Sequence, residues 1–240
     1  MAAKFLDSED IEDLMRARAS DPFSLLGFHR LENKLKTAAI RALNPSAREM
    51  SVRAAGKDYP MAKLHPAGLF EAFVPEDARP YSLVEGGREY LDPYAFGPTI
   101  GEFDSHLVLE GKHYDLHAKL GARIVEHEGV GGTAFAVLAP HALRVSVVGD
   151  FNNWDGRVNM MRRHPVGGIW DIFIPGLGAG ALYKFEILSR DGKVLPLKSD
   201  PFARLAELRP GTASVVWQSD YEWLSAPPDT KTSIAEPVSI

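Results

Sequence analysis

The residues best suited to chemistry lie in a single turn. Residues 147–156 read Val-Val-Gly-Asp-Phe-Asn-Asn-Trp-Asp-Gly, an apolar strand that runs directly into a polar turn. Asn and Asp suit such a turn because their side chains hydrogen-bond to nearby backbone groups and tolerate positive φ. Phe151 and Trp154 are large aromatic side chains in this polar setting. Each must either fold back onto a core or present a flat face to a ligand.

The turn offers both kinds of contact that a sugar needs. The C–H groups of a sugar ring stack on a flat aromatic side chain such as Trp154, and its hydroxyls hydrogen-bond to polar groups such as Asn152 and Asn153. Lys184 offers an ammonium group. It lies in the strand-like run 183–186, where alternation places it on the opposite face from Tyr183 and Phe185. The competing interpretation of Lys184 is a solvated residue that discourages strand aggregation.

The turn belongs to only one copy of an internal repeat. Three pairs of segments correspond: residues 41–48 with 136–143, 70–75 with 170–175, and 92–95 with 200–203. The spacing between the copies grows by about five residues after Val52 and Val147, so the second copy has an insertion there that includes the Phe-Asn-Asn-Trp turn. Because the sister copy folds without it, the insertion favours a function for Trp154. Trp170 corresponds to Phe70 and is predicted to lie in the core.

The surrounding elements are mostly short strands. Residues 8–18 predict a capped amphipathic helix with acids in its first turn, and residues 103–120 a connecting segment that is helical in part. Runs typical of strands, separated by Gly and Pro, occupy residues 37–43, 50–55, 69–74, 81–85, 133–138, 144–149, 169–174, 182–188, 194–197 and 214–217. The sequence therefore predicts an all-β fold of two tandem β-sandwiches, with a short N-terminal helix and a connecting helical segment.

These elements divide the chain into four parts. We expect an N-terminal helix over residues 1–19, a first sandwich over 20–105, a second over 106–225, and a linker over 226–240. The start of that linker is polar and rich in Pro, which is typical of a segment between domains.

Composition excludes several classes of function. The 240 residues are 45% hydrophobic and 25% charged, which is typical of a globular protein. A net charge of −5 argues against a nucleic-acid partner. No apolar run approaches the ~18–20 residues of a membrane span, the start is acidic, and there is no Cys. We expect a cytoplasmic monomer without a membrane partner.

Two further patterns do not predict a site. His113 and His117 are four residues apart, a spacing that could chelate a metal on a helix, but a third ligand is missing. Residues 129–132 are rich in Gly, yet a strand follows where phosphate binding needs a helix. The segment is typical of a hairpin. We expect no metal, no cofactor and no catalytic residue in this chain.

Several spaced motifs resemble known families. Four of them resemble the family 48 carbohydrate-binding module, an immunoglobulin-like β-sandwich: residues 148–154, 168–170, 183–185 and 198–203. Five others resemble bacterial glycogen branching enzymes: residues 21–29, 101–106, 119–123, 131–137 and 209–216. Together the resemblance covers about residues 20–235.

The resemblance implies a function that extends past this chain. Such enzymes carry an N-terminal sandwich, the binding module and then a (β/α)₈ barrel, and they cut an α-1,4-glucan and rejoin the segment through an α-1,6 link. A barrel needs about 250 residues, so the catalytic carboxylates would lie beyond Ile240. The expected partners are an α-glucan, namely glycogen or a malto-oligosaccharide, and the catalytic barrel of the same polypeptide. The resemblance implies that Trp154 and Lys184, with Asn152 and Asn153, contact the glucan.

The sequence also departs from the pattern of the module. Binding members have a second Trp where this chain has Val194, and an Asn where it has Ser214, while Leu138 stands where branching enzymes usually have Trp. One alternative is therefore a structural role, in which both sandwiches brace the barrel and Trp154 lies in the interface. Another is the front of an isoamylase-type debrancher or a trehalohydrolase, against which the motif at residues 21–29 argues.

Overall fold

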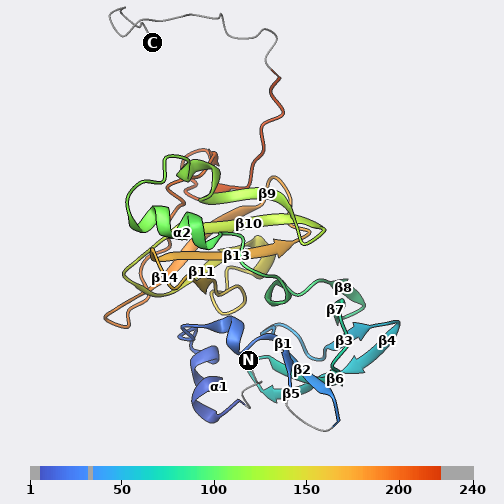
Figure 1. Ribbon diagram of the computed structural model, residues 1–240. Helices are drawn as coiled ribbons and strands as arrows, with labels where there is room; N and C mark the ends of the chain where they lie inside the picture. The colour runs from blue at the N-terminus through green and yellow to red at the C-terminus, as the bar shows by residue number, and fades with distance from the viewer. Residues whose placement is uncertain (1–5, 32–34, 223–240) are drawn as a thin grey trace, which may run out of the picture.

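The chain forms two β-sandwiches, one above the other in Figure 1. The computed structural model describes residues 6–31 and 35–222. The first sandwich is drawn in blue to teal, and the second in green to orange. The predicted all-β fold of tandem sandwiches is confirmed. The predicted linker over residues 226–240 lies outside the described residues.

The N-terminal helix α1 (Ser8–Met15) is shorter than predicted. Its N-cap is Asp7, whose side chain accepts a hydrogen bond from the Asp10 backbone nitrogen, and the Asp10 side chain accepts one from the Asp7 backbone nitrogen. This capping box satisfies two backbone groups that the helix itself cannot. Ala17 has a φ of +50°, so the helix ends before it. Leu14 is fully buried between the helix and the two sandwiches.

Two four-stranded antiparallel sheets make up the first sandwich. One sheet has the order β1 (Gly27–Arg30), β2 (Thr37–Leu43), β6 (Leu69–Pro75) and β5 (Ala62–His65). The other has the order β4 (Lys57–Pro60), β3 (Ser51–Ala54), β7 (Tyr81–Glu85) and β8 (Arg88–Tyr90). Ile40, Val52, Phe70 and Leu83 lie in the core between them. Strands β1, β4 and β5 were not predicted, because they are short and lack a clear alternation.

The second sandwich is built in the same way. One sheet has the order β12 (Arg162–Arg163), β13 (Ile169–Pro175), β10 (Val130–Leu138) and β9 (Gly121–His127), and the other the order β11 (Ala142–Gly149), β14 (Leu182–Ser189), β16 (Ser214–Val215) and β15 (Leu205–Ala206). Trp170 is fully buried in the core, as predicted. The predicted strand over residues 194–197 is wrong, because this segment makes only an isolated bridge from Val194 to Leu188.

The connection between the sandwiches contains short helical segments. They are the 3₁₀ turn η2 (Pro93–Ala95), the helix α2 (Glu102–Leu109) and the 3₁₀ turn η3 (Leu116–Ala118). The partly helical connection predicted from the sequence is thereby confirmed. A further 3₁₀ turn, η1 (Pro22–Ser24), precedes β1.

The internal repeat is confirmed by the pairing of the strands. In the sheet that contains β2 and β6, Ala42 pairs with Phe70, and in the second sandwich their counterparts Val137 and Trp170 pair in the same way. The opposite sheets repeat this correspondence, with Val52 opposite Leu83 and Val147 opposite Phe185.

Each copy also closes with the same buried hydrogen bond. Tyr81 donates from its hydroxyl to Asp92 at 2.7 Å, and Tyr183 donates to Asp200 at 2.6 Å. Burial raises the pKa of both carboxyl groups, that of Asp92 to about 6. Because a buried carboxyl needs a donor, this Tyr–Asp pair fixes the corresponding segment, residues 92–95 and 200–203, to each sandwich.

Tyr94 fastens the two sandwiches to each other. Its hydroxyl lies 3.1 Å from the carbonyl oxygen of Val158 and accepts a hydrogen bond from the Met160 backbone nitrogen at 3.0 Å. The corresponding residue of the second copy, Phe202, has no hydroxyl. A second fastening comes from buried Arg144, whose Nε donates to the carbonyl oxygen of Ala17 at 2.8 Å. The second sandwich is thus hydrogen-bonded both to the segment after the first sandwich and to the N-terminal segment.

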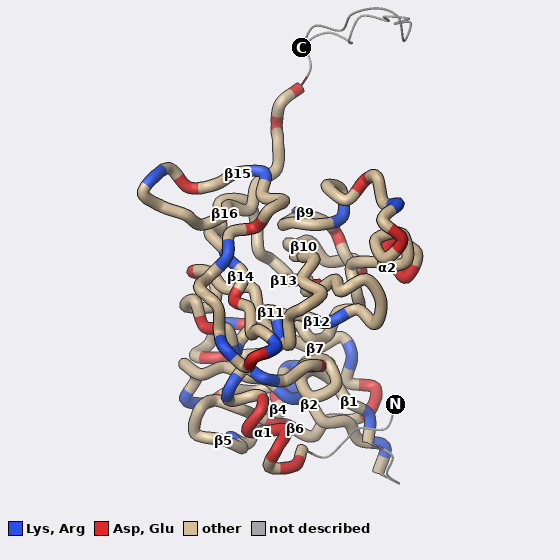
Figure 2. The backbone as a smooth tube through the Cα atoms, turned by 90° about the vertical axis from the view of Figure 1, so that its left-hand side faces the viewer, with Lys and Arg blue, Asp and Glu red and all other residues tan. Residues whose placement is uncertain are grey.

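Charges of both signs are mixed over the molecule. In Figure 2 acidic and basic residues alternate along the tube, and neither sign forms a continuous stripe in that view. Among the helices of the described residues, we find none with the length and apolar character needed to cross a membrane.

We predict that Tyr94→Phe lowers the free energy of unfolding by about 1–3 kcal/mol, because it leaves the buried Met160 N–H without an acceptor. Urea denaturation measures the change. The matched control is Tyr114→Phe, whose side chain is 91% exposed and should change stability by less than about 0.5 kcal/mol. Equal stability of the two variants would contradict the fastening role of Tyr94.

Candidate functional site

The predicted turn begins where β11 ends, and its backbone is strained. After the short 3₁₀ turn η4 (Asp150–Asn152), Asn153 and Trp154 both have left-handed backbones, with φ of +54° and +59°. Asn tolerates this conformation, but for a bulky residue it costs on the order of 1–3 kcal/mol. The Trp154 backbone nitrogen donates to the carbonyl oxygen of Gly149 at 2.9 Å. The surroundings must therefore hold Trp154 in place against this strain.

Asn152 supplies that hold from inside the protein. Its Oδ1 accepts from the Gly149 backbone nitrogen, and its Nδ2 donates to the carbonyl oxygen of Val147 and to Asn159 Oδ1, each at 2.9 Å. The side chain is only 6% exposed. Both of its N–H groups already have protein acceptors. The geometry therefore gives Asn152 a positioning role in place of the direct sugar contact that the sequence predicted.

The two aromatic residues of the turn take opposite directions. Phe151 folds back, and its ring stacks with that of Phe135 in the core at 6.2 Å. Gly149 makes room for this approach, since a Cβ there would lie 2.5 Å from the Phe151 ring. Trp154 stays half-exposed, and its indole Nε1 donates to Asp150 Oδ1 at 2.8 Å. The hydrogen bond fixes the orientation of a partly solvent-facing indole.

Lys184 lies on the same outer face of the sheet as the turn. Its strand β14 alternates, so that Lys184 and Glu186 point away from the core. The turn crosses this face, because Ser146 Oγ donates to the carbonyl oxygen of Gly156 at 2.6 Å. A Cβ on Gly156 would collide with the Glu186 carboxylate. The structure thus brings the Trp154 turn and Lys184 to one face.

Two other polar residues complete this face. Asn153 is exposed at the turn. Thr212, which the sequence analysis missed, accepts a hydrogen bond at Oγ1 from Lys184 Nζ at 2.5 Å. The only indication of Thr212 in the sequence is its position two residues before the last strand, β16. We refer to Asn153, Trp154, Lys184 and Thr212 as the outer-face site. The site combines an aromatic ring with an amide, an ammonium group and a hydroxyl, which suits a ligand rich in hydroxyl groups.

Comparison with known families adds to this geometry. Residues 119–203 match the family described as carbohydrate-binding module 48 (isoamylase N-terminal domain). Residues 7–94 match the family described as the N-terminal domain of the alpha-1,4-glucan branching enzyme GlgB. The chain belongs to the GlgB branching enzyme family and corresponds to its N-terminal region.

Similar full-length proteins carry the same name. The chain is 46% identical to the 1,4-alpha-glucan branching enzyme GlgB of Paramagnetospirillum magneticum, over 94% of this chain and 31% of that protein. It is 46% identical to the GlgB of Rhodospirillum rubrum, over 97% of this chain and 34% of that protein. The chain thus spans about a third of the length of these curated relatives. Among solved structures, a pullulanase complexed with maltotetraose from Anoxybacillus sp. LM18-11 matches 77% of this chain and 25% of its own, at 18% identity and a TM-score of 0.36.

Within the family 48 module, two expected partners of Trp154 are replaced. Ser214 is buried, and its Oγ accepts from the Asp200 backbone nitrogen at 2.9 Å, so it faces the interior rather than the outer-face site. Val194 is 56% exposed but offers no aromatic face. The outer-face site of this GlgB region therefore relies on Trp154 and Lys184.

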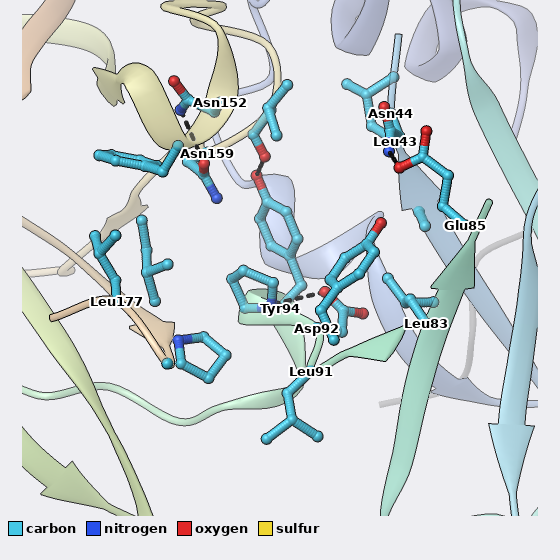
Figure 3. A pocket seen from close by; sticks show the side chains of 18 of the residues that line it. Leu43, Asn44, Leu83, Glu85, Leu91, Asp92, Tyr94, Asn152, Asn159 and Leu177 are labelled. Atoms are coloured by element: carbon cyan, nitrogen blue, oxygen red, sulfur yellow. Dashed lines mark hydrogen bonds between the residues drawn. The ribbon is translucent and has the colours of Figure 1, made fainter. Parts of the chain in front are cut away.

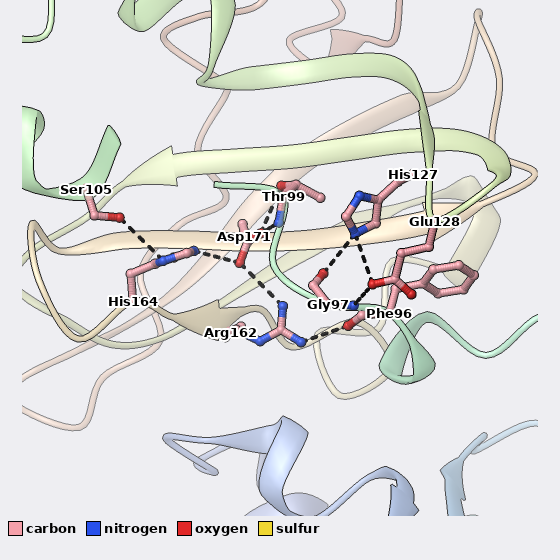
Figure 4. Close-up of polar contacts among 9 residues, drawn as sticks. All are labelled: Phe96, Gly97, Thr99, Ser105, His127, Glu128, Arg162, His164 and Asp171. Carbon is pink, nitrogen blue, oxygen red and sulfur yellow. Dashed lines mark hydrogen bonds and ion pairs between the residues drawn. The ribbon is translucent and has the colours of Figure 1, made fainter. Parts of the chain in front are cut away.

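A second polar cluster has the residue types of a serine-hydrolase triad (Figure 4). Ser105 Oγ lies 3.5 Å from His164 Nδ1, and His164 Nε2 lies 3.0 Å from Asp171 Oδ1. All three residues are buried, and Ser105 Oγ donates to the carbonyl oxygen of Gly101 at 3.1 Å. A nucleophile must be accessible to its substrate, so this arrangement does not fit hydrolysis.

The cluster instead fixes the connection between the sandwiches. Asp171 on β13 accepts hydrogen bonds from the backbone nitrogen and the hydroxyl of Thr99, at 2.5 and 2.8 Å. Beside it, Arg162 donates to the carbonyl oxygen of Phe96 at 2.8 Å. At Gly97, the residue after Phe96, the backbone nitrogen donates to Glu128 at 2.9 Å (Figure 4).

We predict that Asp171→Asn lowers the free energy of unfolding by about 3 kcal/mol at pH 7, because it removes a buried charge that has several partners. Burial alone would raise the pKa of Asp171, but hydrogen bonds from His164 and Thr99 outweigh it and lower the pKa. A lowered pKa means that the carboxylate stabilises the fold fully above its unfolded pKa, about 4, and less as the pH falls through the folded value.

Urea denaturation at pH 7 and pH 3 tests this prediction. The difference in stability between the native chain and Asp171→Asn should shrink at the lower pH. Asp191→Asn, at an exposed position, is the control and should leave stability unchanged at both values. A difference between the native chain and Asp171→Asn that is the same at pH 7 and pH 3 would rule out a stabilising carboxylate.

Proposed function

We propose that this chain binds α-1,4-linked glucan at the outer-face site. The supporting observation is the half-exposed indole of Trp154, held in a strained turn on the same sheet face as Lys184. It lies in a module whose family is described as carbohydrate-binding. A strained backbone that carries an exposed aromatic ring is typical of a binding position.

Each residue of the outer-face site has a distinct task. The indole of Trp154 stacks on a glucose ring, and its hydrogen bond to Asp150 fixes the ring plane before the sugar arrives. A pre-oriented side chain loses little entropy on binding. Lys184 and Thr212, which are already hydrogen-bonded to each other, donate to and accept from the sugar hydroxyls. The amide of Asn153 adds a further donor and acceptor at the turn.

In the parent protein we propose a role in glycogen biosynthesis. The full enzyme would cut an α-1,4 glucan and transfer the segment to an α-1,6 position with catalytic residues that lie in the other two thirds of its length. This region would hold the glucan near those residues. Even a weak site raises the local concentration of a tethered chain, since linking two sites makes the second encounter intramolecular. A cytoplasmic location fits this role.

We predict that Trp154→Ala lowers retention of the chain on glycogen at least about fivefold, because stacking contacts contribute about 1 kcal/mol or more and each 1.4 kcal/mol is tenfold. Its free energy of unfolding should change by less than about 1 kcal/mol, since the side chain is half-exposed. Co-sedimentation with glycogen and urea denaturation measure the two quantities.

The control is Phe103→Ala, which removes an aromatic ring that is 73% exposed on α2. It should retain glycogen as the native chain does. Undiminished retention by Trp154→Ala would contradict the proposal. A loss of several kcal/mol of stability in Trp154→Ala would instead favour the structural alternative, in which the indole serves packing.

A further inference from the structure

A cleft of about 280 Å³ lies between the two sandwiches, behind the turn that carries Trp154 (Figure 3). One wall comes from the ends of β2, β7 and β8 and the segment that follows them, and the other from η4 and the loop after β13. Residues 151–153 line this cleft with their inner side. Trp154, Lys184 and Thr212 are not among the lining residues, and Asn153 is the one residue that the cleft shares with the outer-face site.

Asn159 directs an unused donor into the cleft. Its side chain is only 5% exposed, and its Oδ1 is held by Asn152 Nδ2 at 2.9 Å. No residue in the described part of the chain accepts a hydrogen bond from Asn159 Nδ2. In Figure 3 this nitrogen points away from Asn152 into the space between the walls. The two N–H groups of this amide face the cleft, so they are available to donate to a ligand bound there.

The opposite wall presents an aromatic ring and acceptors. Tyr90 is half-buried and lines the cleft together with Asn44. Asn44 Nδ2 in turn donates to Glu85 Oε2 at 2.7 Å, while no described residue donates to Glu85 Oε1. The wall is thus a connected polar network with one open acceptor beside a ring. Leu177 adds apolar surface across the cleft.

Charge and size restrict the ligand. Arg88 is the one cation among the described lining residues, and it lies opposite Glu85 in the β7–β8 pair. The Glu85 carboxylate would repel a phosphate or other anion, and the single charge of Arg88 only balances that carboxylate. The volume is close to the lower end of the ~300–1,000 Å³ usual for small-molecule sites. These features fit one or two neutral sugar units, with C–H faces for Tyr90 and hydroxyls for Asn159 and Glu85.

We propose that the cleft between the sandwiches is a second α-glucan site, which takes the end of a chain. This inference takes its ligand class, α-glucan, from the proposed function. It does not depend on Trp154 or Lys184. Because Asn152 holds both Asn159 and the Trp154 turn, the two sites stand on opposite sides of one anchored segment. A glucan chain at the outer-face site and a chain end in the cleft would then be held at a fixed distance and orientation to each other.

The test is a titration of maltose into the ¹⁵N-labelled chain, followed by the side-chain amide signals of Asn159. It uses Trp154→Ala, so that the outer-face site does not contribute. We expect the Asn159 signals to shift saturably in this variant. Asn159→Asp keeps the Oδ1 that Asn152 requires but replaces the free donor with an acceptor. In the same background it should weaken maltose binding at least fivefold, as measured by calorimetry.

Arg88→Met provides a second variant that does not touch a buried residue, since Arg88 is exposed at the edge of its sheet. It should also weaken maltose binding at least fivefold in the Trp154→Ala background, because Arg88 lines the cleft and its guanidinium would donate to the sugar hydroxyls beside Glu85. The matched control is Arg48→Met, which is exposed outside the cleft and should bind maltose as Trp154→Ala does.

Two outcomes would overturn the cleft site. One is loss of all maltose binding in Trp154→Ala, which would assign the maltose binding of the native chain to the outer-face site alone. The other is maltose binding that neither Asn159→Asp nor Arg88→Met weakens. If the native chain does not bind glycogen but maltose still shifts the Asn159 signals, the cleft site stands and the proposed function of the outer-face site fails.

Discussion

Three hydrogen bonds of one buried amide hold the turn that carries Trp154. Asn152 ties the end of β11 to the returning loop by holding the Gly149 backbone nitrogen, the Val147 carbonyl oxygen and the Asn159 side chain. These bonds help to offset the strain of the left-handed residues that follow. On the outside the anchor presents the indole of Trp154, and on the inside it fixes the free amide nitrogen of Asn159.

The tandem arrangement gives this anchor a rigid base. Both copies close with the same Tyr–Asp hydrogen bond, but only the first places a hydroxyl, that of Tyr94, against the loop of the other copy. That loop, residues 158–160, also contains the partner of Asn152. Tyr94, which follows the first sandwich, thus contacts the loop that holds the Trp154 turn in place. A duplicated fold can acquire a function in this way, with one copy as support and the other with an insertion.

Much of this organisation could be predicted from the sequence, because alternation and the repeat depend on local patterns. The strand pairs, the burial of Trp170 and the insertion around Trp154 follow from spacing alone. Side-chain roles within the turn could not be predicted. Asn152 and Asn153 are adjacent and identical in type, yet one is buried and the other exposed, because the left-handed backbone turns the chain between them. The inward position of Ser214 and the contact of Thr212 with Lys184 depend on strand register, and the cleft depends on how two domains meet.

The central claim is that Trp154 is the aromatic surface on which the glucan stacks. The chain has four Trp residues, so its indole N–H groups should give four signals in a ¹⁵N spectrum. Titration with maltoheptaose should shift the Trp154 signal saturably and leave that of buried Trp170 in place. A Trp154 signal that does not move, at maltoheptaose concentrations that saturate binding, would contradict the account.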